Sequence, residues 1–224
     1  AVRGFLEDYY GTSEAWTVRR AAQCVLSATN GWLHAQTQRG EGRFDKDRGH
    51  VCTFSALVFK GREVHLLHVG DTRVYRVHPA ALEQLSHDHR VRLDGGQTYL
   101  GRALGIGPHL EIDHACWPTE VGETFLLATD GAYEHLDTLL VVNTLAHHGD
   151  DLQAAAQALV AAALARGSQD NATVMLARVD SLPDQLAPPV RRERLRLPPR
   201  LAPRMEFEGY RVVRELYASA RSQV

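Results

Sequence analysis

The runs Val51-Cys-Thr-Phe-Ser-Ala-Leu-Val-Phe59, Val64-His-Leu-Leu-His-Val69 and Val74-Tyr-Arg-Val77 decide the fold class. They are short, rich in β-branched and aromatic residues, and separated by turn signals at Gly61 and Gly70-Asp71. Short β-rich runs with glycine between them are typical of antiparallel strands joined by tight turns. This stretch therefore predicts a meander of three strands.

Further strands and helices are predicted downstream of the meander. The run 123–129 reads as a strand that ends at Asp130-Gly131, and the run 173–179 reads as another. Helical patterns lie between these two runs and continue to Gly167. The clearest spans residues 150–166, with an apolar face, Asp150 as the N-cap and Gln153 three residues later. Strands and helices thus share one domain.

The two flanks of this region differ in character. Residues 2–10 and 17–37 predict helices, and residues 38–49 predict a loop. Beyond residue 179, six of the nine prolines fall between Pro183 and Pro203, which is typical of a linker. We therefore expect a main domain at 1–180, a Pro/Arg-rich linker at 181–204 and a short tail at 205–224 that adds one or two strands.

Composition excludes several classes of protein. The 224 residues are 44% apolar, enough for a sizeable core, yet no apolar run reaches the roughly 20 residues of a membrane-spanning helix. No basic-then-apolar leader opens the sequence, so we expect a cytoplasmic protein that does not bind membranes. Cys24, Cys52 and Cys116 are widely spaced and form no CxxC pair, which argues against a disulfide framework and against a zinc site.

Charge is unevenly distributed along the chain. The net charge is -2, but residues 181–224 carry nine arginines against five acidic residues, or +4. The arginines between Arg191 and Arg196 lie among prolines without interleaved aromatic residues. This pattern favours a solvated linker, and we expect no nucleic-acid partner.

Three carboxylates lie where predicted strands end or begin. Asp71 follows the run 64–69, Asp130 follows the run 123–129, and Asp170 precedes the last run. Mg²⁺ and Mn²⁺ prefer carboxylate and water oxygens, and two such ions lower the pKa of a shared water and neutralise phosphoryl charge. Such a centre suits phosphate-ester hydrolysis. Each aspartate alone is equally a common turn or capping residue, so the surrounding sequence has to decide.

Five motifs occur in a fixed order: His68-Val-Gly-Asp-Thr-Arg-Val-Tyr75, Leu85-Ser-His-Asp-His89, Arg102-Ala-Leu-Gly105, Leu127-Ala-Thr-Asp-Gly131 and Gly167-Ser-Gln-Asp-Asn-Ala-Thr173. This series resembles the type 2C serine/threonine protein phosphatase family, and the resemblance covers residues 51–179. The resemblance implies an α+β fold, a four-layer α/β/β/α sandwich of two antiparallel sheets flanked by helices. It also implies metal-dependent hydrolysis of phosphoserine and phosphothreonine on protein substrates.

By this resemblance, Asp130 and Asp170 are ligands of two Mn²⁺ or Mg²⁺ ions, and Asp71 helps to hold a third, as in bacterial members. Neither a nucleophilic side chain nor an organic cofactor site is expected. The family's Asp-Gly-x-Gly-Gly motif, whose Asp bridges both metals, does not occur in this sequence, and neither does the family's phosphate-binding Arg. We therefore expect a domain without its N-terminal strands, which hydrolyses weakly or not at all in this form.

The tail carries a second resemblance. Phe207-Glu-Gly-Tyr-Arg-Val-Val-Arg-Glu-Leu216 resembles the first strand of a protein kinase domain, as in bacterial fusions of phosphatase and kinase. An ordinary edge strand is the alternative for these residues. For the main domain, the leading hypothesis is a phosphatase whose activity belongs to the full-length parent. The alternatives are a non-catalytic phosphatase-like module that binds or regulates a partner, and an unrelated β-sandwich.

Overall fold

The computed structural model describes residues 2–43, 49–92, 98–184, 202–207 and 210–214. By its internal contacts the chain divides into two units, Ala1–Leu182 and Pro183–Val224, which are described separately. Within the described residues, no helix combines the length and the apolar content needed to cross a membrane.

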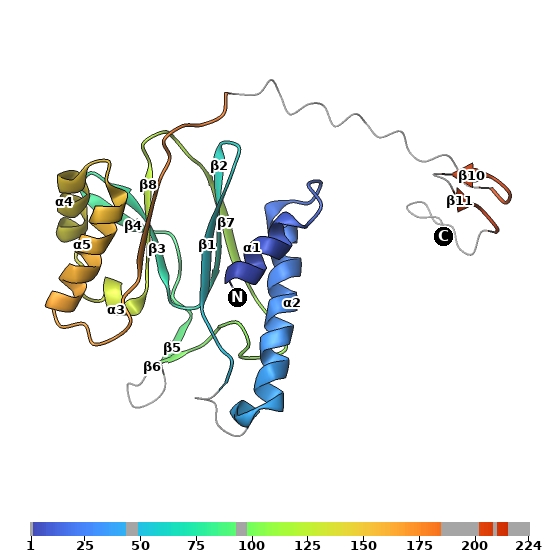
Figure 1. The fold of residues 1–224 in the computed structure, drawn as a ribbon, viewed down its shortest axis with the longest axis horizontal. Helices are drawn as coiled ribbons and strands as arrows, with labels where there is room; N and C mark the ends of the chain where they lie inside the picture. Colours follow the sequence, from blue (N-terminus) through green and yellow to red (C-terminus); the bar gives the residue numbers. More distant parts are fainter. Residues whose placement is uncertain (1, 44–48, 93–97, 185–201, 208–209, 215–224) are drawn as a thin grey trace. The chain divides into compact units, whose positions relative to one another are not determined.

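Two antiparallel sheets form the centre of the first unit (Figure 1). The three-stranded sheet has the order β1 (Phe54–Lys60), β2 (Glu63–Val69), β7 (Asp113–Pro118). The four-stranded sheet has the order β4 (Ala81–Gln84), β3 (Arg73–His78), β8 (Thr124–Ala128), β9 (Val174–Arg178). A separate ladder joins β5 (Arg90–Arg92) to β6 (Thr98–Leu100).

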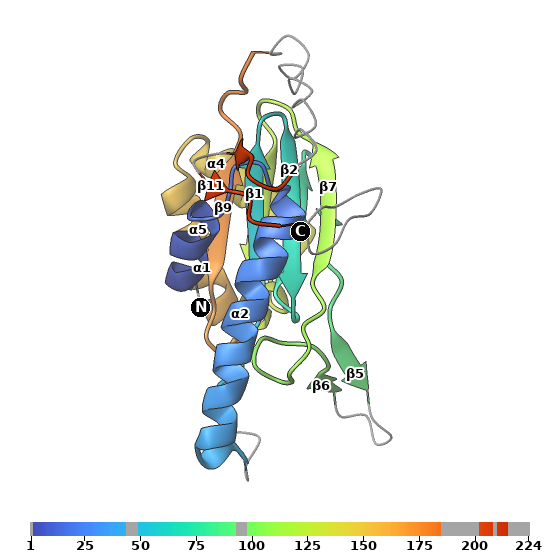
Figure 2. The same ribbon diagram turned by 90° about the vertical axis from the view of Figure 1, so that its right-hand side faces the viewer.

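Helices cover the outer faces of the two sheets. The three-stranded sheet is covered by α1 (Val2–Tyr10) and α2 (Val18–Arg39), the latter followed by a 3-10 turn at Glu41–Arg43, and Figure 2 shows α2 running along the sheet. The four-stranded sheet is covered by α3 (Asp130–Tyr133), α4 (Thr138–His148) and α5 (Leu152–Ala165). The layers are therefore α/β/β/α, and the predicted α+β fold class is confirmed.

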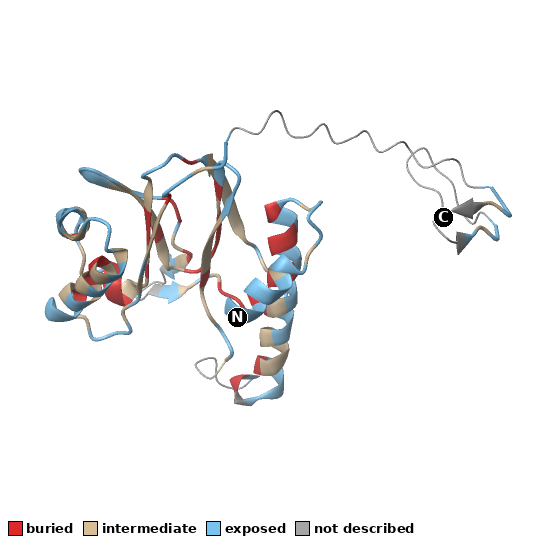
Figure 3. Cartoon of the chain, turned by 45° about the horizontal axis from the view of Figure 1, so that its top comes forward, coloured by how far each residue is buried: buried red, intermediate tan, exposed pale blue. Residues whose placement is uncertain are grey.

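Three apolar clusters hold these layers together. Leu26 and Leu67 pack between the N-terminal helices and the three-stranded sheet. Leu66 and Phe125 pack between the two sheets, and Leu159 packs between the four-stranded sheet and its helices. All five side chains are at most 2% exposed. In Figure 3 the buried segments accordingly lie where strands and helices face one another.

Only the first hairpin of the predicted three-stranded meander forms, because β3 leaves it after the Gly70-Asp71 turn and pairs with β4 and β8 in the other sheet. β1 pairs with β2 from Phe54↔Val69 to Lys60↔Glu63, and the turn contains Gly61 in the left-handed region, at φ 64°. The first strand begins at Phe54 and not at residue 51, because Cys52 forms a separate bridge with Leu104. The predicted strands near residues 123–129 and 173–179 are β8 and β9.

One local prediction needs correction, and one strand was not predicted. The N-cap of α5 is Asp151, whose side chain accepts a hydrogen bond from the Ala154 backbone N–H, and not Asp150. The segment 111–121, which has no clear strand pattern, forms β7 in the three-stranded sheet. Its alternation is masked because His114 and Cys116 lie on the same face of β7.

The second unit is described only in short pieces. β10 (Glu206–Phe207) pairs with β11 (Tyr210–Arg211) in a two-stranded antiparallel ladder. Much of the predicted kinase-like strand, at 208–209 and from residue 215 onwards, lies outside the described residues, as does most of the linker. The kinase resemblance therefore stays a prediction.

Candidate metal centre

The three predicted ligands lie at one end of neighbouring strands. Asp71 lies between β2 and β3, Asp130 is the first residue of α3, two positions after β8 ends, and Asp170 precedes β9. The registers Arg73↔Ala128 and Ala128↔Val174 place these strand ends side by side. The sheet thereby gathers residues that are up to about a hundred positions apart in the sequence.

Backbone contacts hold the Asp130 and Asp170 turns against each other. The Thr129 backbone N–H donates to the Thr173 carbonyl at 3.1 Å. A Cβ atom on Gly131 would lie 2.7 Å from the Asn171 carbonyl oxygen and 3.1 Å from the Asp170 Cβ, so this contact requires glycine. The Asp-Gly dipeptide is thus needed for close packing as well as for its turn.

Each of these two carboxylates has one oxygen fixed by the backbone. Asp130 Oδ1 accepts from the Gly131 N–H at 3.0 Å, and Asp170 Oδ1 accepts from the Asn171 N–H at 2.7 Å. Among the described residues, no hydrogen bond or ion pair reaches the Oδ2 atom of Asp170. That oxygen is accordingly available to a cation.

A basic side chain occupies the space between the other two aspartates. Arg90, at the start of β5, donates from Nε to Asp71 Oδ2 at 2.8 Å, from Nη2 to Asp130 Oδ2 at 3.1 Å and from Nη1 to Glu134 Oε1 at 3.2 Å. Burial opposes its charge, but the bonds to Asp71 and Glu134 dominate and raise the pKa of Arg90 further above its ordinary value. One guanidinium therefore bridges three carboxylates.

The predicted ligands do not converge on a single point. Within the described residues, the only group of three or more carboxylate, imidazole or thiol donors whose atoms all lie within 4.8 Å of one another is elsewhere. The guanidinium of Arg90 explains the wider spacing of Asp71 and Asp130, because it lies between them. An all-oxygen donor set suits Mg²⁺ or Mn²⁺. The Oδ2 atom of Asp170 has no partner among the described residues, whereas Arg90 already pairs with both Asp71 and Asp130.

A buried hydrogen-bonded chain fixes the backbone beside Asp71. His89 Nδ1 accepts from the Gly70 N–H at 3.0 Å, so the Nε2–H of the neutral ring donates to Asp113 Oδ2 at 2.9 Å. The Gly70 carbonyl accepts from the His89 N–H at 2.8 Å, and Arg102 donates to the other oxygen of Asp113. Burial alone would raise the pKa of Asp113, but the bonds from His89 and Arg102 lower it.

His68 lies beside this chain and is fully buried. Its Nε2–H donates to the His87 carbonyl at 3.0 Å, which leaves Nδ1 to accept from the Ser55 hydroxyl at 2.8 Å. Burial lowers its pKa, the nearby His89 ring lowers it further, and Asp113 acts in the opposite direction. His68 and His89 therefore position the Asp71 turn.

Arg73 and Asp88 form a second ion pair, next to the Tyr133 ring. Arg73 forms a two-pronged ion pair with Asp88, at 2.8 Å from Nη2, and its guanidinium lies 4.0 Å from the centre of the Tyr133 ring. The Tyr133 hydroxyl is buried without a hydrogen-bond partner among the described residues, and burial raises its pKa. A buried hydroxyl without a partner beside these carboxylates marks a place where a bound water or cation-held oxygen would complete the hydrogen bonding.

Two charged residues of this centre were missed by the sequence analysis. Glu134 lies four positions after Asp130, and that spacing alone places both on one helical face. Arg90 has no comparable signal, because its partners are 19, 40 and 44 positions away. Only the folded sheet brings them together.

A family model agrees with the fold and with the motif order. The model described as Stage II sporulation protein E (SpoIIE) matches residues 13–180, three-quarters of the chain. The chain belongs to the SpoIIE family. The match includes all three aspartates and Arg90, so the centre described above lies within the SpoIIE domain.

Curated relatives of this SpoIIE-family chain are phosphatases by name. The "Probable protein phosphatase 2C 9" of Arabidopsis thaliana is 27% identical over 162 residues, and the matched region covers 60% of this chain. The chain spans 57% of the length of that relative. The "Serine/threonine phosphatase stp" of Listeria welshimeri is 26% identical over 187 residues, 73% of either chain.

Solved structures show the same fold. The catalytic domain of the serine/threonine protein phosphatase PstP, in complex with two manganese ions, superposes with a TM-score of 0.65 at 22% identity. The match covers 80% of this chain and 79% of that one. The SpoIIE-family chain therefore has the architecture of type 2C protein phosphatases.

Proposed function

We propose that this chain provides most of a metal-dependent protein phosphatase domain that hydrolyses phosphoserine and phosphothreonine. The observation that carries the proposal is the placement of Asp71, Asp130 and Asp170 at adjacent strand ends, in a fold shared with type 2C phosphatases. Phosphorylated proteins are the proposed substrates. The names of the relatives support this substrate class.

In this proposal Asp130 and Asp170 hold Mn²⁺ or Mg²⁺. Ions of this kind lower the pKa of water and neutralise charge on phosphoryl oxygens. The protein's part is to fix the two carboxylates, which it does through the backbone N–H groups of Gly131 and Asn171. Each backbone bond orients one oxygen of its carboxylate, while the second oxygen of Asp130 accepts from Arg90.

Two ions, and not three, fit the residues of this chain. Asp71 is 18% exposed and already paired with Arg90 at 2.8 Å. A divalent cation between Asp71 and Asp130 would lie within a few ångströms of the guanidinium and would be repelled by it. We therefore propose that Arg90 supplies the positive charge that a third ion would supply at Asp71.

We also propose that additional strands complete the sandwich. Within the described residues β1 and β9 are each the outer strand of their sheet. A groove of about 420 Å³ lies along them and is lined mostly by apolar side chains, among them Phe54, Leu127 and Met175. Open strand edges beside an apolar groove are suited to receive further strands. Strands carrying the Asp-Gly-x-Gly-Gly motif would bring the bridging carboxylate and complete the centre.

Hydrolysis of p-nitrophenyl phosphate tests the proposed activity. The protein expressed together with its upstream coding sequence should show Mn²⁺-dependent turnover, and Asp130→Asn should reduce it at least about 100-fold, because the substitution removes a charged metal ligand. Equal rates for the two proteins would remove Asp130 from the mechanism. An upstream sequence without Asp-Gly-x-Gly-Gly, combined with no turnover, would instead support a non-catalytic phosphatase-like module.

The remaining expectations concern the protein as a whole. We propose a bacterial, cytoplasmic protein in which a kinase-like domain follows the phosphatase domain in the same chain. The motif at Phe207–Leu216 supports this proposal. Kinase elements in the downstream coding sequence would agree with it, and their absence would leave β10 and β11 as an ordinary hairpin.

A further inference from the structure

Four side chains with metal-binding atoms share one face of the β2–β7 ladder. Residues at alternate positions of a strand lie on the same face, so Glu63 and His65 of β2 lie together, as do His114 and Cys116 of β7. The register pairs His65 directly with Cys116. This face lies outside the sandwich, beside the N-terminal helices, and is separate from the Asp130 centre.

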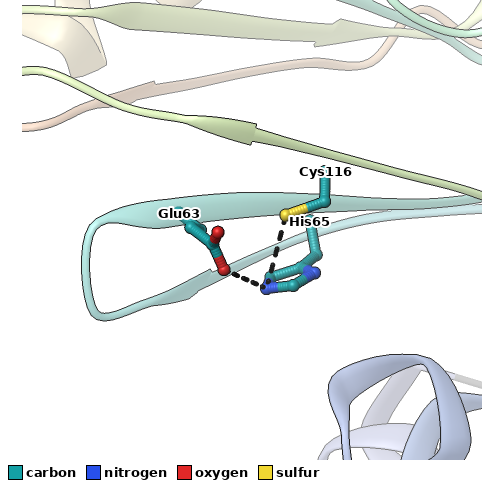
Figure 4. Close-up of side chains that lie close together, drawn as sticks. All are labelled: Glu63, His65 and Cys116. Carbon is teal, nitrogen blue, oxygen red and sulfur yellow. Dashed lines mark hydrogen bonds and ion pairs between the residues drawn. The ribbon is translucent and has the colours of Figure 1, made fainter. Parts of the chain in front are cut away.

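Three of these side chains direct their donor atoms toward one point. The Nε2 atom of His65 lies 3.8 Å from the Cys116 sulfur and 3.9 Å from the Glu63 Oε2 atom (Figure 4). All three donor atoms lie within 4.8 Å of one another. Zinc bonds of about 2.0–2.3 Å in a tetrahedral arrangement separate neighbouring donors by about 3.3–3.8 Å. The two distances from His65 Nε2 need a contraction of only a few tenths of an ångström.

The fourth side chain orients the imidazole of His65. His65 Nδ1 lies 3.3 Å from His114 Nε2, and the two rings are stacked with centroids 5.5 Å apart. When Nδ1 carries the proton and donates it to His114, the Nε2 lone pair faces the sulfur and the carboxylate. Metal-binding histidines are commonly oriented by a hydrogen bond from their second nitrogen in this way. Burial lowers the pKa of both imidazoles, which favours the neutral form that binds metal.

A catalytic cysteine is the competing interpretation of this cluster, and the geometry disfavours it. A nucleophile–base–acid arrangement needs the carboxylate on the ring nitrogen opposite the sulfur. Here Glu63 and Cys116 lie at the same nitrogen of His65.

We propose that Glu63, His65 and Cys116 form a Zn²⁺ site on the outer face of the β2–β7 ladder. One nitrogen, one sulfur and one oxygen ligand suit Zn²⁺ and exclude the all-oxygen environment that Mg²⁺ and Mn²⁺ prefer. Binding replaces the thiol proton of Cys116, which passes to solvent, and water fills the fourth position. The side chain of Glu63 is 60% exposed, so the ion enters from solvent.

The site cross-links β2, which leads to the Asp71 turn, and β7, whose first residue supports that turn. β2 ends two residues before Asp71, and β7 begins at Asp113, which binds His89 and through it Gly70. Zinc would hold β2 and β7 together at the other end of the same ladder. We therefore assign the ion a structural role and not a hydrolytic one.

Cobalt substitution tests the site directly, because Co²⁺ bound to a thiolate gives a sulfur-to-metal charge-transfer absorption that oxygen sites lack. The chain should bind one Co²⁺ with this band, and Zn²⁺ should displace it. Cys116→Ser and His65→Ala should abolish the band, and His114→Phe should weaken Co²⁺ binding about 10–100-fold.

Two control variants test whether the absorption band comes from this site and not from another thiol or from the proposed phosphatase centre. Cys24→Ser removes an exposed thiol on α2 and should leave the band unchanged. Asp130→Asn/Asp170→Asn removes the proposed phosphatase ligands and should also leave it unchanged. Absence of the band in the parent chain, or its persistence in a folded Cys116→Ser protein, would overturn the proposal whether or not the phosphatase assignment holds.

Discussion

The contact of Arg90 with three carboxylates makes a quantitative prediction about the substitution Arg90→Ala. The guanidinium is 27% exposed, and Asp71, Asp130 and Glu134 are 18%, 40% and 52% exposed. Charge-assisted bonds contribute about 1.5–3 kcal/mol when buried and about 0.2–1 kcal/mol when exposed. The Asp71 bond lies between these limits and the other two lie near the lower one. Together the three bonds predict that Arg90→Ala lowers the free energy of unfolding by about 2 kcal/mol.

The same substitution leaves Asp71 and Asp130 facing each other without a cation. A loss of about 2 kcal/mol should lower the unfolding temperature by about 4–8 °C for a domain of this size. Mn²⁺ should then bind between the two carboxylates. A ligand whose concentration is 100 times its dissociation constant stabilises the folded state by about 2.7 kcal/mol. Mn²⁺ should therefore restore most of the lost stability and raise the number of bound ions by one.

Differential scanning fluorimetry and isothermal titration with Mn²⁺ measure these two effects. Arg166→Ala is the matched control, since Arg166 forms an exposed ion pair with Asp137 at 2.7 Å, away from the three aspartates. That variant should lose at most about 1 kcal/mol and should bind no additional ion. An identical Mn²⁺ stoichiometry and thermal shift in the parent and in Arg90→Ala would refute the idea that Arg90 takes the place of an ion.

Three further predictions follow from single contacts. Gly70→Ala should destabilise the domain by about 3 kcal/mol in chemical denaturation, because Gly70 has φ 123° and a Cβ there would lie 2.5 Å from the Thr53 Cβ. Asp151→Ala should cost about 1 kcal/mol through loss of the α5 cap, while the neighbouring exposed Asp150→Ala should have less effect. Burial lowers the pKa of His68 below its ordinary 6.5, so the unfolded state takes up a proton first and stability falls as the pH drops below 6.5. Unfolding at pH values above and below 6.5 should show a smaller decrease for His68→Gln, and an unchanged pH dependence would exclude His68 as a contributor.

The strands of the sandwich were predictable because their signals are local. β1, β2 and β3 are short apolar runs separated by Gly61 and Gly70, although no local signal shows that β3 passes into the other sheet. β7 was missed because His114 and Cys116 occupy positions where an apolar pattern would be visible. Their polarity does not indicate a loop, because both side chains lie on the face of β7 where we propose the Zn²⁺ site. Neither β7 nor the proposed Zn²⁺ site that it shares with β2 could therefore be predicted from a sequence pattern.

The centre was predictable only in part. The positions of Asp71, Asp130 and Asp170 follow from motifs that each lie within a few residues. The interaction of Arg90 with Asp71 and Asp130 depends on strand registers and on where β5 begins, which no local pattern encodes. The third ion expected at Asp71 stays a prediction, and the Arg90 guanidinium beside that carboxylate is the feature that no sequence pattern indicated.

Charge balance connects Arg90 to the metal requirement of the proposed phosphatase. Arg90 contacts Asp71, Asp130 and Glu134, so this group carries three negative charges and one positive charge before Asp170 is added. A phosphoryl group is itself negative and would be repelled by such a surface. One arginine cannot reverse that sign, whereas divalent cations at Asp130 and Asp170 can. The centre should therefore bind phosphate only after it has bound metal, and inorganic phosphate should show no measurable binding to the metal-free chain.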